Sequence, residues 1–120
     1  MPLEPKHAAY LWDMLDAARA ITSFIEGKSL DNLADRMLRG AVGRNLEVIA
    51  EAARRVSRVV RDEYPEIPWQ SIIAQRRNVL AHKYGETRHE RVWAVCVDGI
   101  PTLVRWLERF GIDRPAAGDL

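Results

Sequence analysis

The chain has very little cysteine and no long hydrophobic run. Cys96 is the only cysteine among 120 residues, so an intrachain disulfide is impossible and a zinc site built on several thiolates is excluded. No stretch approaches the roughly 18 consecutive apolar residues that a membrane-spanning helix needs. Residues 1–5 lack the basic and then apolar segments of a secretory signal. We therefore expect a cytoplasmic protein in a reducing compartment, with no membrane contact.

An excess of one charge is also missing. The chain has 18 Lys and Arg against 17 Asp and Glu, a net charge of +1, which gives no global electrostatic reason to bind nucleic acid. Nearly all the basic residues are arginines, and several recur at helical spacings: Arg36, Arg39, Arg44, Arg54, Arg55, Arg58 and Arg61. We favour a solvated helix face for this series, with a phosphate-binding stripe as the alternative.

Apolar residues recur at steps of three and four through most of the chain, which is the spacing of amphipathic helices. No alternating strand pattern and no hairpin signal is present. The sequence therefore predicts an all-α, up-and-down bundle of four to five helices. The expected helices cover residues 5–26, about 31–60, 68–82 and 87–110. Residues 1–112 should form this single domain, followed by a flexible tail at 113–120.

Several residues are expected to begin, end or bend these helices. Gly27 should end the first helix, and Ser29 or Asp31 should cap the second. Pro68 suits the first turn of the third helix, and Pro101 should kink or split the last one. Within the second helix, two glycines either permit close approach of another helix or mark a bend: Gly40 and Gly43.

Most common catalytic signatures are absent. The sequence has no phosphate-binding glycine loop, no pair of histidines at metal-ligand spacing and no Gly-x-Ser-x-Gly elbow, so we expect no metal and no bound cofactor. His7 and His89 are expected to be solvated surface residues. The tryptophans fall within amphipathic segments, so we expect them in the core or a dimer interface rather than stacked on bases: Trp12, Trp69, Trp93 and Trp106.

His82 stands out because of its neighbours. In the sequence Arg77-Asn78-Val79-Leu80-Ala81-His82-Lys83-Tyr84, Asn78 and His82 are four residues apart and share one face of a helix. Arg77 and His82 are five apart, which rotates them by roughly 140° and separates them by about 7.5 Å along the axis. A regular helix cannot present both to one small group. Either the helix ends near His82, or a second copy of the chain completes the site.

Metal-free cleavage of RNA is a reaction for which a site completed by a second copy of the chain would be useful. The reaction needs one group to take the proton from the 2′-hydroxyl and another to protonate the leaving 5′-oxygen. One chain offers one suitable histidine, His82, whereas a symmetric dimer offers two. Arg77 would neutralise charge on the transition state. On spacing alone, a surface arginine and a hydrogen-bonded histidine at a helix end remain the simpler interpretation.

The longer string Arg77-Asn78-x-x-Ala81-His82-x-Tyr84 resembles the signature of HepT-like toxins in the HEPN superfamily. The similarity continues outside the motif: residues 39–52 resemble the family's long second helix, and other matching positions are Tyr64-Pro65, Pro68-Trp69, Trp93 and Ile100-Pro101. Two positions differ from the usual pattern, because Gln75 and Ala50 stand where relatives often have glycine. Neither difference removes a chemical group.

The resemblance implies a HEPN-like fold and a homodimeric, metal-independent endoribonuclease, the toxin of a toxin–antitoxin pair. The two active-site segments would meet at the dimer interface. Arg77 would bind the scissile phosphate of the RNA, His82 would transfer protons, and Asn78 would orient His82 or the RNA. The implied partner is a minimal nucleotidyltransferase antitoxin that transfers AMP from ATP to Tyr84. The added bulk and negative charge beside His82 would exclude and repel an RNA phosphate.

Two other functions fit parts of the sequence. A non-catalytic helical module would dimerise and dock a nucleotidyltransferase, with Arg77 and His82 binding a nucleotide phosphate. A helical metal protein with four carboxylates is less favoured, although Glu86 and His89 match the Glu-x-x-His spacing of such bundles.

Overall fold

Helices occupy most of the described residues for which the apolar spacing predicts them. A computed structural model describes residues 4–80 and 86–114, and at 75–80 and 86–88 it describes the backbone alone. Its elements, in order, are α1 (Pro5–Ile25), η1 (Leu30–Ala34), α2 (Arg36–Arg55), α3 (Arg58–Glu63), α4 (Trp69–Leu80), α5 (Glu86–Ala94), η3 (Val95–Gly99) and α6 (Ile100–Arg109). Five of these helices have nine or more residues, and the described part contains no strand. The all-α prediction is confirmed.

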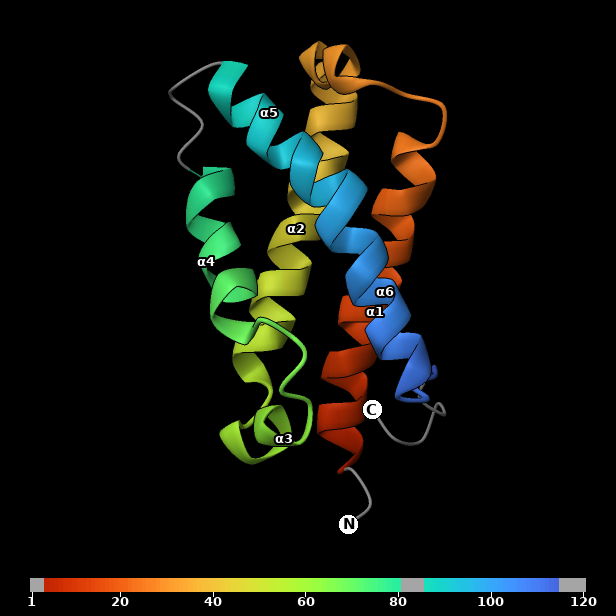
Figure 1. Cartoon of the computed structure of the whole chain (residues 1–120), viewed down its shortest axis with the longest axis vertical. Coiled ribbons are helices and arrows are strands. Elements are labelled where there is room, and N and C mark those ends of the chain that lie inside the picture. Colours follow the sequence, from red (N-terminus) through yellow and green to blue (C-terminus); the bar gives the residue numbers. More distant parts are fainter. Residues whose placement is uncertain (1–3, 81–85, 115–120) are drawn as a thin grey trace.

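The helices form two layers. α1, α2 and α4 lie side by side, and α5 and α6 cross diagonally over them (Figure 1). The described part measures 45 × 25 × 22 Å. The core lies between the layers, where the apolar faces of three helices meet. Its buried residues include Leu11, Met14, Leu15, Ala18 and Ile21 of α1, Val42, Leu46, Ile49 and Ala53 of α2, and Ile100, Leu103 and Leu107 of α6.

The end of α1 is set by a glycine, as the sequence predicts. Gly27 has a φ of +72°, a left-handed backbone conformation that residues with a Cβ rarely adopt. The chain can therefore leave the helix there and turn towards η1. None of the helices in the described part is long and apolar enough to cross a membrane.

The prediction of one continuous second helix is wrong. Residues 30–34 form the separate turn η1, and α2 begins only at Arg36, where the Asp35 carboxylate accepts a 2.9 Å hydrogen bond from the Met37 N–H. Neither Ser29 nor Asp31 therefore caps α2. Short polar side chains end the helical hydrogen-bonding pattern locally, although the apolar spacing continues across the breaks.

The second break separates α2 from α3. The hydroxyl of Ser57 accepts a 3.3 Å hydrogen bond from the Val60 N–H, which begins α3 three residues after α2 has ended. α2 itself runs unbroken through Gly40, and a methyl group added there would meet no other described atom within 4 Å. Gly40 therefore does not interrupt α2 and does not mark a close contact with another described helix.

The last predicted helix is split, as expected from Pro101. The π-helical turn η3 separates α5 from α6, and Pro101 lies in the first turn of α6. A proline there has no N–H to donate to the preceding turn. Cys96 lies within η3 and is fully buried, and burial raises the pKa of its thiol to about 12.

His7 is buried, so its prediction as a surface residue is wrong. Only 9% of it is exposed, and its ring meets Tyr10 edge-on with 6.0 Å between the ring centroids. α1 already begins at Pro5, so His7 occupies the same face as Leu11. The predicted tail at 113–120 lies outside the described residues beyond Arg114, and the domain limits of 1–112 stay a prediction.

Candidate active site

The beginning of α4, the helix that carries the first part of the motif, is held firmly by the core. The indole N–H of Trp69 donates a 3.2 Å hydrogen bond to the carbonyl oxygen of Tyr64, and only 7% of Trp69 is exposed. The Arg61 guanidinium lies 5.9 Å from the centroid of the same ring. Pro68 precedes the helix and its carbonyl oxygen accepts the Ile72 N–H. The tryptophan therefore serves packing, as the sequence predicts.

Two of the four predicted site residues lie in the last described residues of α4. Arg77 and Asn78 are neighbours near the Leu80 end of the helix, where the structure describes the backbone alone. His82 and Tyr84 lie outside the described residues. The roles of these residues stay predictions. The structure does describe the helices before and after residues 81–85. α4 packs against α2, and α5, which begins at Glu86, packs against η1 and η3.

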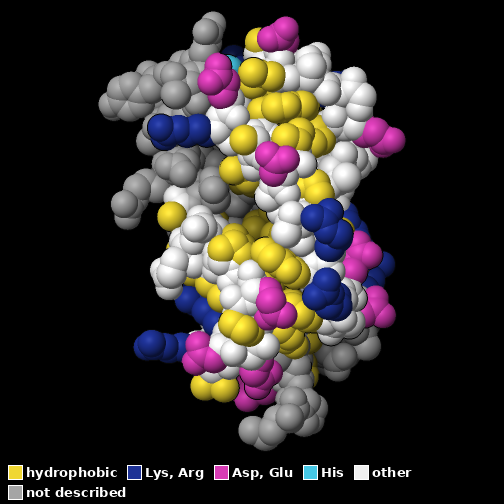
Figure 2. Space-filling view, viewed as in Figure 1, with side chains coloured by type: hydrophobic (Ala, Val, Ile, Leu, Met, Phe, Trp, Pro, Cys, Tyr) yellow, Lys and Arg dark blue, Asp and Glu magenta, His cyan; other side chains and the backbone are white. Residues whose placement is uncertain are grey.

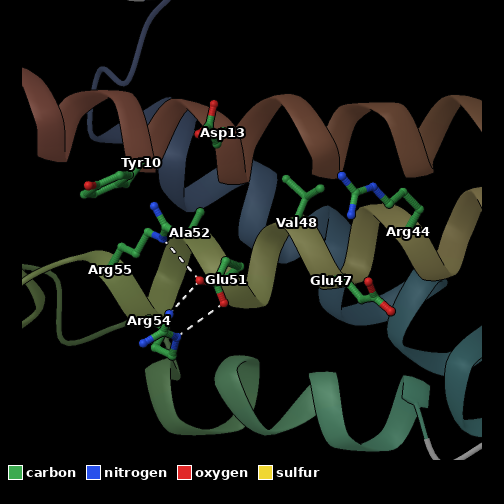
Figure 3. A pocket seen from close by; sticks show the side chains of 9 residues that line it. All are labelled: Tyr10, Asp13, Arg44, Glu47, Val48, Glu51, Ala52, Arg54 and Arg55. Carbon is green, nitrogen blue, oxygen red and sulfur yellow. Dashed lines mark hydrogen bonds and ion pairs between the residues drawn. The ribbon is translucent and has the colours of Figure 1, made fainter. Parts of the chain in front are cut away.

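A groove of about 510 Å³ runs between α1 and α2 on the face away from α6 (Figure 3). Its apolar surface comes from Tyr10, Val48 and Ala52, and its rim carries acidic and basic side chains in equal number. The lining residues are Tyr10, Asp13, Arg44, Glu47, Val48, Glu51, Ala52, Arg54 and Arg55. The acidic residues of this set and Tyr10 were not identified from the sequence, because only the packing of α1 on α2 brings them together.

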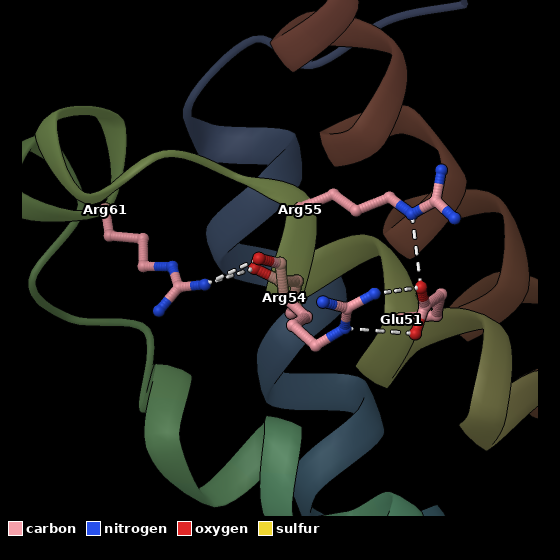
Figure 4. Close-up of polar contacts among 5 residues, drawn as sticks. Glu51, Arg54, Arg55 and Arg61 are labelled. Atoms are coloured by element: carbon pink, nitrogen blue, oxygen red, sulfur yellow. Dashed lines mark hydrogen bonds and ion pairs between the residues drawn. The ribbon is translucent and has the colours of Figure 1, made fainter.

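Glu51 organises one end of the groove (Figure 4). Its carboxylate accepts hydrogen bonds of 2.6 Å and 3.3 Å from Arg54 and of 3.2 Å from Arg55. These two arginines hold the pKa of Glu51 at about 2, well below its ordinary value. Glu51 precedes Arg54 by three residues and Arg55 by four, and in a helix this spacing predicts such ion pairs from the sequence.

The arginine series has mainly structural partners. Besides Arg54 and Arg55, Arg39 donates to the carbonyl oxygen of Leu33 at 3.0 Å, and Arg61 donates to carbonyl oxygens at the end of α2. The side chains of Arg36, Arg44 and Arg58 make no hydrogen bond or ion pair with another described residue. This supports the helix-face interpretation over a continuous phosphate-binding stripe.

Asp13 lies on the α1 side of the groove without a basic partner. Partial burial, and secondly the nearby carboxylate of Asp16, raise the pKa of Asp13. No ion pair joins it to another described residue, although three arginines line the same groove. No group of three or more His, Cys, Asp or Glu within the described ranges is arranged to hold a metal ion.

The comparisons with known proteins agree on one family. The family model described as "Ribonuclease HepT-like" matches residues 14–110. The chain is 30% identical to "Putative RNase MJ1380" of Methanocaldococcus jannaschii, over 83% of the chain and 92% of the relative. It is also 30% identical to "Probable ribonuclease HepT" of Thermococcus cleftensis, over 84% of the chain and 92% of the relative. No solved structure matches the chain.

The all-helical, HEPN-like bundle defines the class of protein. Since the family model spans most of the chain, including α4 and the motif residues that follow it, the chain belongs to the HepT-like ribonuclease family.

Proposed function

We propose that this protein is a metal-independent endoribonuclease and the toxin of a toxin–antitoxin pair. The observation that carries the proposal is the extent of the family match, residues 14–110, which contains the whole string from Arg77 to Tyr84. The placement of Arg77 and Asn78 on α4, a helix that packs against α2, supports the proposal.

In the proposed reaction, two copies of His82 act on one phosphodiester. A neutral imidazole takes the proton of the RNA 2′-hydroxyl, and the 2′-oxygen forms a bond to phosphorus. The bond from phosphorus to the 5′-oxygen breaks, and the imidazolium of the other copy protonates that oxygen. The products are a 2′,3′-cyclic phosphate and a 5′-hydroxyl. Arg77 stabilises the additional charge on the phosphate in the transition state, and Asn78 orients His82 or the RNA.

The proposed control acts through Tyr84. A nucleotidyltransferase antitoxin would bring ATP to the tyrosine, whose hydroxyl oxygen would bond to the α-phosphorus as pyrophosphate leaves. The attached AMP carries a negative phosphodiester next to His82. An RNA phosphate would then be excluded by bulk and repelled by charge.

The test compares the wild type with His82→Ala on RNA in the presence of EDTA. His89→Ala is the matched control, since His89 lies on α5 outside the motif. We expect the wild type and His89→Ala to leave cyclic phosphate ends, and His82→Ala to cleave about a hundred-fold or more slowly. Equal cleavage by all three proteins, or cleavage only after a divalent metal is added, would contradict the proposal.

The balanced charge of the groove favours a second candidate, a non-catalytic module that docks the nucleotidyltransferase. Arg54 and Arg55 form ion pairs with Glu51, so their positive charge is partly neutralised and attracts RNA less strongly. A growth test separates the two functions. A defect on expression that disappears with Arg77→Ala indicates the nuclease, whereas harmless expression together with tight binding to the partner indicates the module.

A further inference from the structure

The face formed by α5, η3 and α6 leaves apolar side chains partly exposed. Figure 2 shows hydrophobic side chains gathered along this face of the molecule. Val97 of η3 is 40% exposed, and Pro101 and Val104 of α6 are half-buried. Because these residues recur at steps of four and three, they lie on one side of the helix and form an apolar ridge. The ridge runs beside the buried face of α6 that packs on α1.

Two opposite charges lie next to this ridge, about two helical turns apart. Asp98 and Arg105 are both exposed, and Thr102 lies between them on the same side of the helix. The Thr102 hydroxyl donates a 2.9 Å hydrogen bond to the carbonyl oxygen of Asp98 and accepts one of 3.0 Å from the Arg105 guanidinium. Neither Asp98 nor Arg105 makes an ion pair with a described residue. Both charges are therefore available to an outside group.

The order of these residues makes the face complementary to itself. The midpoint between Asp98 and Arg105 falls between Pro101 and Thr102. When two copies of the helix lie antiparallel about a two-fold axis at this midpoint, Asp98 of each copy lies opposite Arg105 of the other. Val104 of each copy then lies against Pro101 of the other. Asp98 would instead repel a nucleic acid, and the face has no excess of positive charge to attract one.

We propose that two copies of this chain pair along α6 in antiparallel directions, with Asp98 of each copy against Arg105 of the other and the two apolar ridges in contact. This contact does not rest on the proposed function. The groove between α1 and α2 lies on the face away from α6, so a second copy on α6 leaves the groove uncovered (Figure 3). If the nuclease also dimerises through its motif, the contact along α6 joins such dimers into a larger assembly.

A charge exchange tests the contact. Sedimentation at a series of concentrations gives the Kd of each association step for the wild type, Asp98→Arg, Arg105→Asp and the double variant. Each single variant places like charges opposite one another twice, so we expect the Kd of one step to rise by about ten-fold or more. The double variant restores opposite charges and should return to within a few-fold of the wild type. Asp62→Arg and Arg58→Asp make the same changes at exposed positions of α3 and should leave every Kd unchanged.

A cross-link tests the register of the two helices. Thr102 lies beside the proposed two-fold axis, so the Thr102→Cys side chains of two copies should come close enough to form a disulfide on mild oxidation. Cys96 is fully buried and does not compete. Thr22→Cys, at an exposed position of α1, is the matched control and should stay uncross-linked. Equal cross-linking of both variants, or none of Thr102→Cys, would contradict the register.

The outcomes also separate this contact from the nuclease proposal. A wild type that stays monomeric, or whose association steps are all unmoved by both single variants, would overturn the contact and leave the nuclease proposal standing. Loss of one step in the single variants and its return in the double variant would support the contact. If the same proteins, wild type included, then fail to cleave RNA, the nuclease proposal fails alone.

Discussion

The guanidinium of Arg61 donates a 3.1 Å hydrogen bond to the carbonyl oxygen of Ala53, eight residues earlier in the chain. It also donates to the carbonyl oxygen of Arg54 at 2.9 Å (Figure 4). A further bond of 3.0 Å goes to the carbonyl oxygen of Val56. Carbonyl groups in the last turn of a helix have no partner within it, and the negative end of the helix dipole favours a cation. Arg61 therefore fastens α3 to the end of α2.

Replacing this arginine should destabilise the fold. Arg61→Met keeps an apolar stem for contact with Trp69 but removes the donors, and we expect the free energy of unfolding to fall by about 1–3 kcal/mol. Arg61→Lys should recover part of the loss, since an ammonium cannot span the three carbonyls as a guanidinium does. Urea denaturation measures the change. Arg58→Met on the same helix is the control, and an equal effect of both methionine variants would argue against the specific role of Arg61.

The depressed pKa of Glu51 predicts a pH dependence. A carboxyl group whose folded pKa is lowered from 4.5 to about 2 stabilises the fold above its ordinary pKa, and this contribution is lost as the pH falls through that window. Glu51→Gln should therefore have a lower Tm than the wild type near neutral pH. The difference should close between pH 4.5 and about pH 2. Glu63→Gln on α3 serves as the control near neutral pH and should change Tm little, because the exposed Glu63 makes no ion pair with another described residue.

Asp13 should show the opposite behaviour. Its raised folded pKa means that the ionised carboxylate is less favourable in the folded than in the unfolded chain. Asp13→Asn removes this charge and should raise Tm at neutral pH. The gain should disappear as the wild-type carboxyl becomes protonated towards its ordinary pKa of 3.8. A Tm that falls on substitution at pH 7 would show that Asp13 has a favourable partner in the folded protein.

The sequence predicted those features of the fold that individual residues determine locally. Gly27 ends α1 because a residue without a Cβ adopts the left-handed conformation there, and Pro101 lies just after the split between α5 and α6 because it has no N–H to donate. The break at Ser57 was missed, since Val56 and Val60 continue the apolar spacing across it. One hydrogen bond from the Val60 N–H to the Ser57 hydroxyl sets the start of α3, and the spacing of apolar residues does not reveal it.

The motif and the groove also differ in how far the sequence alone could predict them. The motif is contiguous, so Arg77 and Asn78 were placed on one helix from their spacing alone, and the structure describes that helix. The groove joins Asp13 of α1 to Arg44 of α2, which are far apart in the sequence. Its charged residues become neighbours only when α1 packs on α2, and no local pattern in a single sequence predicts that contact.

In the proposed nuclease, one active site requires His82 from two copies of the chain. Wild type and His82→Ala are mixed in varied proportions, allowed to exchange subunits, and assayed on RNA at constant total protein. A site that uses both histidines is active only in wild-type homodimers, so the cleavage rate should fall with the square of the wild-type fraction, to about one quarter in an equal mixture. A rate that falls in direct proportion to the wild-type fraction would show that each chain cleaves with its own histidine, and would contradict the account.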